Sequence, residues 1–345
     1  MRVGAAPLHY TKPPRRKLPN SSPQRSAVHV LLEIAARFGD ALSQRWLKRR
    51  GNPFYGEITL VADALGKPGV YLLNIIYEWA CSTSAAPDPG GSGNRMIRIL
   101  DWGMPGIGRH IVLGRHTTEN GPYYNVTWPG FAGVLTAMAP GRFAAAINQA
   151  PRQAPIGVRW LDEAIVHLRM YAAGGTLPAP HLLRQVFEAA PNYAAALTML
   201  MDADVDLAMP ALFMLSGTGP EETCVIEALG RRRIAHRGKM ALGSIVGVAN
   251  RWLTADLPGK PRDNALMPFD RQTAEANNLE RQRGICDLPR GTFTGVADLA
   301  PPLLNSHTVL VASANARQGQ STVEALDGGS DGSVLPMVIG RVTVE

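Results

Sequence analysis

The chain has 345 residues, of which 46% are hydrophobic and 18% charged, and its formal net charge is +7. This composition allows a sizeable core, in one large domain or two ordinary ones, and excludes an intrinsically disordered protein. No run reaches the roughly 18 consecutive apolar residues of a membrane span, and the first ten residues lack the apolar core of a secretory signal. We therefore expect a cytoplasmic protein.

The first 26 residues form a basic segment that is rich in Pro and Ser, with six Lys or Arg residues before the first acidic residue, Glu33. Such a segment buries too little apolar surface to order itself, so residues 1–26 are predicted to be a flexible arm. Further basic clusters lie at residues 45–50 and 231–233. They suit weak contact with an anionic lipid surface, but without interleaved aromatic residues or a binding module we expect no nucleic-acid partner.

Residues 27–80 are predicted to form a helical N-terminal segment. Apolar residues recur at helical spacing from Ala27 to about Lys48, a short helix follows over 57–65, and a third, mostly buried helix follows over 70–79. The apolar stripes of these helices give the segment a docking face.

After residue 80 the pattern changes to short strands separated by Gly and Pro turns. Strands are expected at 96–100, 111–113, 124–128, 133–137 and 142–147, and again at 211–215, 223–229, 244–249, 308–312 and 334–344. Helical spacing returns between them, from 157 to about 203, with a break at Pro178 to Pro180. This order predicts an α+β fold in which two sheets lie between helical layers.

Cys81 directly follows the apolar run 70–80 and begins a Cys-Ser-Thr-Ser stretch. If the chain is cut before it, the thiol lies beside its own α-amine, with a pKa of about 7.7–8.0, so that nucleophile and base come from one residue. Arg98 and Asp101 lie 17 and 20 positions downstream, within reach of a turn and a returning strand. We expect this hairpin to bring the three side chains together; burial of Cys81 as an ordinary core residue is the alternative.

The other cysteines, Cys224 and Cys286, complete neither a metal-ligand spacing nor an even set of disulfides. Cys224 lies in an apolar, strand-like run and is expected to fill the core. The eight histidines are scattered, without metal-ligand spacing or the sequence of a nucleophile elbow. We expect no metal and no other cofactor.

Several stretches with consistent order and spacing resemble one known family. They are Gly56-Glu57 to Gly66, Leu72-Leu73-Asn74 with Tyr77-Glu78, Cys81-Ser82-Thr83, Arg98 to Trp102, and Phe131 to Phe143 followed by Asn148-Gln149. Together these stretches resemble the acid ceramidase and N-acylethanolamine acid amidase family. Its members are N-terminal nucleophile cysteine hydrolases, related to the choloylglycine hydrolases. The likeness runs from about residue 31 to about residue 283.

The resemblance implies that residues 81–345 form the four-layer αββα sandwich of this class of hydrolases. It further implies a precursor that cuts itself between Ala80 and Cys81, with the N-terminal fragment retained as a non-covalent partner. The mature enzyme would hydrolyse the linear amide bond of a small-molecule N-acyl amide through a thioester on Cys81. An acyltransferase that passes the acyl group to an amine is an alternative, as is a non-catalytic binding scaffold.

Other site residues also follow from the resemblance. Asn250, in a Val-Ala-Asn-Arg-Trp stretch, takes the oxyanion-binding role, although Asn at a strand end is also a common turn residue. Arg281 matches the family's distal arginine, with Arg283 as a competitor. Asn148 and Gln149 fall where relatives carry a polar pair ending in Glu, so their contact with an oxyanion or amine competes equally with a cap or turn.

Overall fold

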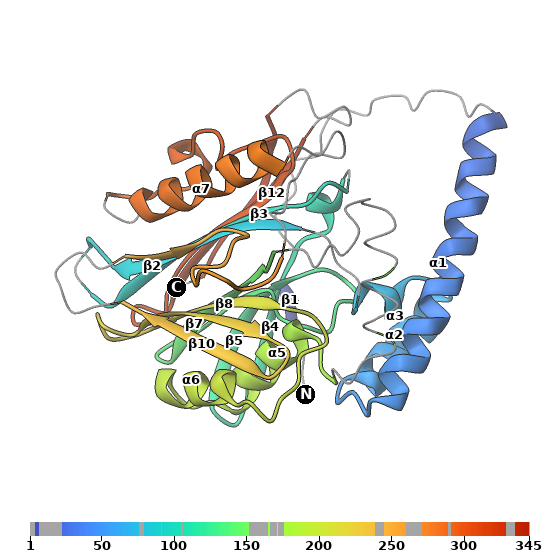
Figure 1. Ribbon diagram of the computed structural model, residues 1–345, viewed down its shortest axis with the longest axis horizontal. Helices are drawn as coiled ribbons and strands as arrows, with labels where there is room; N and C mark the ends of the chain where they lie inside the picture. Colours follow the sequence, from blue (N-terminus) through green and yellow to red (C-terminus); the bar gives the residue numbers. More distant parts are fainter. Residues whose placement is uncertain are drawn as a thin grey trace.

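The computed structural model describes residues 4–6, 23–75, 79–90, 92–104, 106–151, 165, 171, 176–238, 245–259, 271–288, 291–328 and 335–344. Two antiparallel sheets lie face to face, helices cover their outer faces, and a helical unit stands at one side (Figure 1). The expected α+β fold with its four layers is therefore confirmed.

The larger sheet has eight strands among the described residues, in the order β1-β4-β5-β6-β7-β8-β9-β10. Its strands are β1 (Gly4–Ala6), β4 (Val112–Thr118), β5 (Gly121–Thr127), β6 (Thr136–Ala139), β7 (Phe143–Gln149), β8 (Ala211–Gly217), β9 (Thr223–Leu229) and β10 (Arg232–Arg237). The smaller sheet has six, in the order β11-β2-β3-β12-β13-β14. They are β11 (Val246–Val248), β2 (Ala80–Pro87), β3 (Asn94–Asp101), β12 (Thr308–Asn315), β13 (Gln320–Asp327) and β14 (Met337–Val344).

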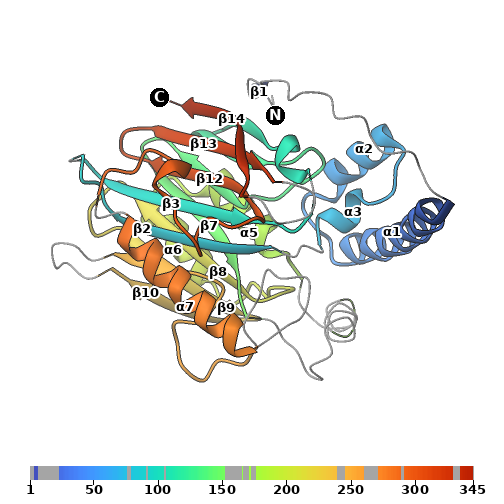
Figure 2. The ribbon, with the colours of Figure 1, turned by 90° about the horizontal axis from the view of Figure 1, so that it is seen from above.

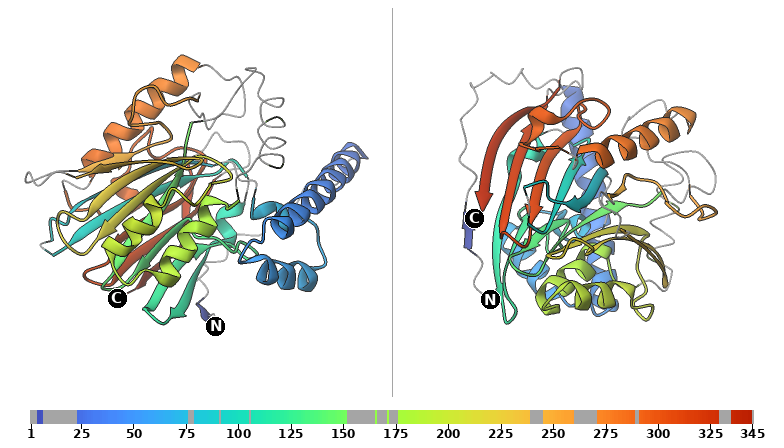
Figure 3. Two further views of the ribbon diagram at one scale, coloured as in Figure 1. Left: turned by 60° about the horizontal axis from the view of Figure 1, so that its bottom comes forward. Right: turned by 90° about the vertical axis from the view of Figure 1, so that its left-hand side faces the viewer.

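The helices fall into two groups. The N-terminal unit consists of α1 (Pro23–Arg49), α2 (Tyr55–Leu65) and α3 (Val70–Leu73), and it stands beside the sandwich (Figure 3, left). The outer layers are α5 (Ala179–Ala189) with α6 (Tyr193–Met201), and α7 (Arg271–Asp287). Seen from above in Figure 2, α7 lies alongside β2, and it contacts β2 and β11. Two short 3-10 turns, η1 (Ile107–His110) and η3 (Val296–Asp298), lie in loops.

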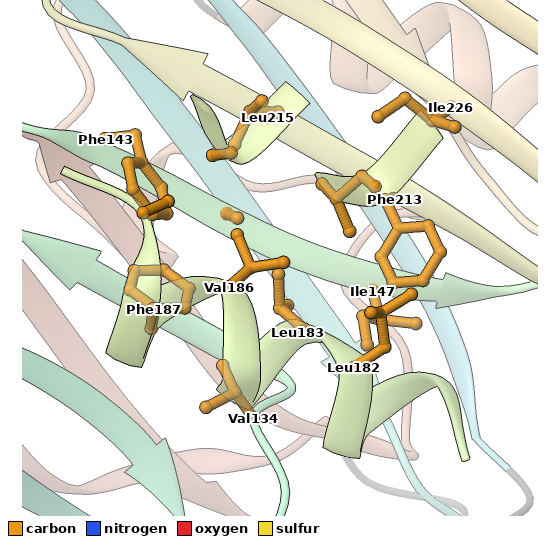
Figure 4. Close-up of a cluster of buried hydrophobic side chains, with 14 of the residues drawn as sticks. Val134, Phe143, Ile147, Leu182, Leu183, Val186, Phe187, Phe213, Leu215 and Ile226 are labelled. Carbon is orange, nitrogen blue, oxygen red and sulfur yellow. The ribbon is translucent and has the colours of Figure 1, made fainter. Parts of the chain in front are cut away.

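Apolar side chains fill the space between the larger sheet and its helices. Val186 and Phe187 of α5 pack against Phe143, Phe213 and Leu215 of the sheet (Figure 4). The cluster also contains Cys224, which is fully buried, as expected of a core residue. Burial raises the pKa of the Cys224 thiol to about 11, so this cysteine stays an uncharged thiol.

One predicted element is shorter in the structure. The helix expected over 70–79 ends at Leu73. The reason is Asn74, whose side-chain amide donates hydrogen bonds of 2.8 Å to the carbonyl oxygens of both Val70 and Gly130. By bonding to Gly130 of the sandwich, Asn74 turns the chain towards the sheets. By contrast α2 ends as predicted, at Gly66 in the left-handed conformation (φ 58°).

The remaining elements agree with the sequence in kind, with four omissions. The strands β1, β10 and β13 and the helix α7 were not expected, and β1 lies within the segment predicted to be a flexible arm. Arg232–Arg237 is mostly basic, has two apolar residues side by side and lies at the edge of a sheet, and α7 carries no clear apolar stripe. The helical pattern predicted over 157–170 lies outside the described residues except for residue 165. No described helix has the length and apolar character needed to cross a membrane.

Candidate active site

Cys81 is the second residue of β2, and the strand runs through it from Ala80 without a break. Its side chain is fully buried and belongs to the apolar cluster between the two sheets. The sulfur lies 3.9 Å from the carbonyl oxygen of Ile147 on β7, the strand facing it in the other sheet. The candidate nucleophile is therefore enclosed by the fold in the uncut chain.

Arg98 on β3 reaches the sulfur directly. Its Nη2 lies 2.8 Å from Sγ of Cys81 and donates to the carbonyl oxygen of Ile147 at the same distance. Its Nη1 donates to Oγ1 of Thr83 at 2.9 Å and to Oδ1 of Asn148. The contact follows from strand register, because Thr83 pairs with Arg98 and side chains two residues apart share a face.

Two opposed effects act on the thiol. Complete burial raises the pKa of Cys81, and the positive charge of Arg98 lowers it, with burial the larger of the two. Burial likewise lowers the pKa of Arg98, while the neighbouring Cys81 raises it. The structure thus holds a neutral thiol beside a cation that stabilises the thiolate when it forms.

Asp101 does not join Cys81 and Arg98 in the way the sequence suggested. It pairs with Ala80 in the hairpin, and its position relative to Arg98 directs its side chain to the opposite face of the sheet, towards α7. There its carboxylate, 1% exposed, forms an ion pair with Arg281 and accepts a hydrogen bond of 2.8 Å from Thr308. Its charge still acts on the thiol through space and raises the pKa of Cys81.

The structure distinguishes between the two candidate arginines on α7. Arg281 is 4% exposed, and its Nε donates to Oγ of Ser82 at 3.1 Å, while Arg283 is exposed. Arg281 therefore joins α7 to Asp101 and to Ser82, the residue after Cys81. It lies behind β2, on the face opposite the thiol.

Two amide side chains hold the backbone around the Ala80–Cys81 peptide. Asn250 accepts a hydrogen bond of 2.6 Å from the N–H of Cys81 through Oδ1, and its Nδ2 donates to the carbonyl oxygen of Gln149 at 2.8 Å. Gln149 in turn accepts from the N–H of Trp79 at 3.1 Å through its side chain. The N–H groups on both sides of Ala80 are thereby fixed.

Asn148 bridges the two sheets. Its Oδ1 accepts from Thr83 at 2.6 Å and from Arg98, and its Nδ2 donates to the carbonyl oxygen of Val248 at 2.8 Å. Asn148 and Gln149 are the last two residues of β7 and are paired with β8, so neither is the turn residue considered as an alternative.

Sequence reasoning missed the supporting residue Glu227 on β9. This buried carboxylate accepts hydrogen bonds from the backbone N–H groups of Leu253 and Thr254 and lies 2.8 Å from Nε2 of His236. It fixes the loop that follows Asn250. An acidic residue inside the apolar run 223–229 was the available signal, because a buried carboxylate requires partners.

A cleft of about 510 Å³ opens beside this arrangement. Its walls include Arg251 and Trp252, which follow Asn250, and Asn278 of α7, one helical turn before Arg281. Its volume lies within the range of small-molecule sites. Pro151, Gly259, Glu275, Ala276 and Leu279 complete the lining.

No protein-family model and no curated protein matches the sequence. Among solved structures, the chain is similar to the Caenorhabditis elegans ortholog of N-acylethanolamine-hydrolyzing acid amidase. The TM-score is 0.51 at 15% identity, over 77% of this chain and 100% of that chain. A mutant of the conjugated bile acid hydrolase from Clostridium perfringens matches with a TM-score of 0.41 at 9% identity, over 76% of this chain and 96% of that one.

The first of these similarities covers most of this chain and the whole of the other. It confirms, at the level of the fold, the resemblance drawn from Cys81-Ser82-Thr83 and the stretches around it. The protein thus has the αββα sandwich fold of the N-terminal nucleophile hydrolases, with Cys81 at the second position of a central strand.

Proposed function

We propose that the protein is a self-processing cysteine amidase that hydrolyses the amide bond of a small-molecule N-acyl amide. The observation that carries the proposal is the contact between the Cys81 sulfur and Arg98 at 2.8 Å, next to a peptide whose flanking N–H groups are both held. A buried cation beside a thiol favours the thiolate, which is the nucleophilic form. A fixed peptide beside it supplies the first carbonyl to attack.

Self-cleavage comes first, because the fully buried thiol is closed to an external substrate. The Cys81 sulfur attacks the carbonyl carbon of Ala80, the C–N bond of the Ala80–Cys81 peptide breaks, and the thiol proton passes to the departing nitrogen. Water then hydrolyses the thioester, which gives a carboxylate on Ala80 and restores the thiol. Cys81 is left as an N-terminal residue with a free amine.

Turnover repeats this chemistry on a substrate. The α-amine of Cys81 takes the thiol proton and delivers it to the leaving amine, while the sulfur forms a thioester with the acyl group. Water releases the acid. Arg98 lies on the β3 strand of the processed domain, so it stabilises the thiolate in both reactions.

Contacts of the helical unit support its retention after cleavage. Glu57 of α2 forms a bidentate pair with Arg184 of α5, with oxygen to nitrogen distances of 2.7 and 2.8 Å. Asn52 lies 2.8 Å from Nδ1 of His181. Burial and the nearby Arg184 lower the pKa of His181 to about 3, so this contact stays uncharged at neutral pH. The Arg184 side chain is almost fully buried, while the Glu57 side chain is 47% exposed, so the pair lies at the edge of the contact between the helical unit and α5.

Weak contact with an anionic lipid surface also belongs to the proposal. Phe38, Leu60 and Leu65 of the helical unit are more than half exposed, and Lys48 and Arg49 lie in the last turn of α1. Exposed apolar and basic side chains together suit an anionic interface. Cosedimentation with phosphatidylserine vesicles checks this contact, and a protein that stays in the supernatant at low salt would disprove it.

Purified protein is expected to consist of two fragments that separate only under denaturing conditions. Intact-mass measurement should show cleavage at Ala80–Cys81, and sequencing of the larger fragment should begin Cys-Ser-Thr-Ser. Under native conditions the fragments should elute together, because the bidentate ion pair of Glu57 and the buried contact of Asn52 join them. The processed protein should hydrolyse fluorogenic N-acyl amides.

Two variants control this experiment. Cys81→Ala should remain full length and inactive, because no thiol attacks the Ala80 carbonyl. Cys224→Ser removes a thiol on the outer side of the larger sheet and should be cleaved as in the wild type. A chain that stays whole at neutral and mildly acidic pH, or a first residue other than Cys81, would refute the proposal.

A further inference from the structure

The proposed self-cleavage provides information about the substrate. Two thioesters form on the same sulfur of Cys81, one in processing and one in turnover. In the first, the acyl group is the chain ending in Trp79 and Ala80; in the second, it is the acyl group of the substrate. The side chains around Trp79 before cleavage therefore indicate which kind of acyl group fits next to the Cys81 sulfur.

Trp79 lies in an aromatic, buried environment. It is 3% exposed, and its ring packs edge-to-face on Trp102, with ring centroids 5.6 Å apart. Trp102 packs in the same way on Trp128 at 5.2 Å. These separations match the preferred geometry of aromatic pairs. Leu100 and Phe131 belong to the same cluster as the three tryptophans and Cys81.

The walls of this environment belong to the catalytic domain. Trp102 follows β3, and its N–H donates to the carbonyl oxygen of His307 at 2.8 Å. Trp128 follows β5, and its indole N–H donates to the carbonyl oxygen of Ile107 at 3.0 Å. These anchoring contacts involve only residues after the cleavage point, so the aromatic walls stay in position after the chain is cut.

Trp79 itself does not stay. Cleavage creates a carboxylate on Ala80, which is 7% exposed and pairs with Asp101 across the hairpin. A charged chain end at this buried position is unfavourable, because water does not solvate it there. We therefore expect Ala80 to move out to solvent after cleavage and to take Trp79 with it. An apolar space lined by Trp102 opens next to the thiol.

We propose that the acyl site accepts arylalkanoyl groups, that is, an alkyl chain bearing an aromatic ring that takes the place of the Trp79 indole. This inference rests on the proposed amidase function and specifies its substrate class. The covalent path from the Ala80 carbonyl carbon to Cβ of Trp79 runs through Cα and N of Ala80 and then C and Cα of Trp79. The straight chain of a 6-(indol-3-yl)hexanoyl group has the same length.

The test compares three amides of 7-amino-4-methylcoumarin, bearing 6-(indol-3-yl)hexanoyl, hexanoyl and hexadecanoyl groups, on processed enzyme. The aryl amide should have a kcat/KM at least about tenfold above that of the hexanoyl amide, as expected for burial of an aromatic ring. It should also exceed that of the hexadecanoyl amide. Trp102→Leu should abolish most of the aryl preference, measured as the ratio of kcat/KM for the aryl amide to kcat/KM for the hexanoyl amide.

Two variants separate this effect from a general loss of packing. Phe187→Leu also replaces a buried aromatic side chain by leucine, on the far side of the larger sheet, and should keep the aryl preference. Trp79→Leu alters a residue that leaves the site, so it should slow self-cleavage and keep the preference of the processed enzyme. This inference alone is overturned if processed enzyme hydrolyses all three amides without aryl preference. It is also overturned if Trp102→Leu keeps the aryl preference. A chain that is neither cleaved nor active on any amide overturns the proposed function with it.

Discussion

Arg98→Met should slow self-cleavage and amide hydrolysis by roughly 10- to 1,000-fold. The cation lies 2.8 Å from the Cys81 sulfur, and it is the main influence that lowers the pKa of a thiol which burial raises. An opposite charge at such a distance shifts a pKa by about 1–3 units. Without it the pKa of Cys81 rises further, and the thiolate fraction at a given pH falls tenfold for each unit.

The pH profile distinguishes this electrostatic role from a structural one. In Arg98→Met the rise of the cleavage rate with pH should move to higher pH by about 1–3 units, so that alkaline pH restores much of the rate. Arg98→Lys keeps the charge, so its pH profile should lie between those of the wild type and Arg98→Met. Because Arg98 also binds Ile147 and Asn148, thermal melting must show that each variant is folded. A folded Arg98→Met protein cleaved at the wild-type rate and with the wild-type pH profile would remove Arg98 from the mechanism.

Local sequence patterns were sufficient to locate the hairpin that carries Cys81 and Arg98. The apolar run before Cys81 and the glycine-rich turn before Arg98 predict two paired strands, and the register Thr83↔Arg98 follows from a short connection. The same parity also shows why Asp101 faces away from Arg98: residues an odd number of positions apart on one strand lie on opposite faces. The sequence contained this information, and the expectation of a three-residue cluster overlooked it.

Other parts of the site depend on tertiary contacts that no local pattern encodes. The bond from Cys81 to Asn250 joins residues 169 positions apart, and that from Trp79 to Gln149 joins residues 70 apart. The helix α7 was missed because its residues are mostly polar, and the sheet buries only a few of them, among them Arg281. Helix formation there depends on packing more than on an amphipathic pattern.

Asn250→Ala should lower the turnover number of processed enzyme on the order of 100-fold and change KM much less. Removing one side chain that acts on the developing charge of the tetrahedral intermediate typically has this effect. In the uncut chain the side chain is fully buried and binds the N–H of Cys81 at 2.6 Å. After cleavage that nitrogen becomes an amine, so Asn250 remains next to the group that moves the proton.

Gln149→Leu provides the matched comparison, since both side chains hold the backbone around Ala80. Gln149 binds the N–H of Trp79, which leaves the site after cleavage, so Gln149→Leu should slow self-cleavage but keep the turnover number of molecules that have been cut. Asn250→Ala should lower both the rate of self-cleavage and the turnover number of the processed enzyme. Intact mass gives the processed fraction, and kinetics on a fluorogenic N-acyl amide give kcat per processed molecule. An unchanged kcat in fully processed Asn250→Ala would show that Asn250 has only the structural role of an asparagine after a strand. A backbone amide would then be the better candidate for the oxyanion donor.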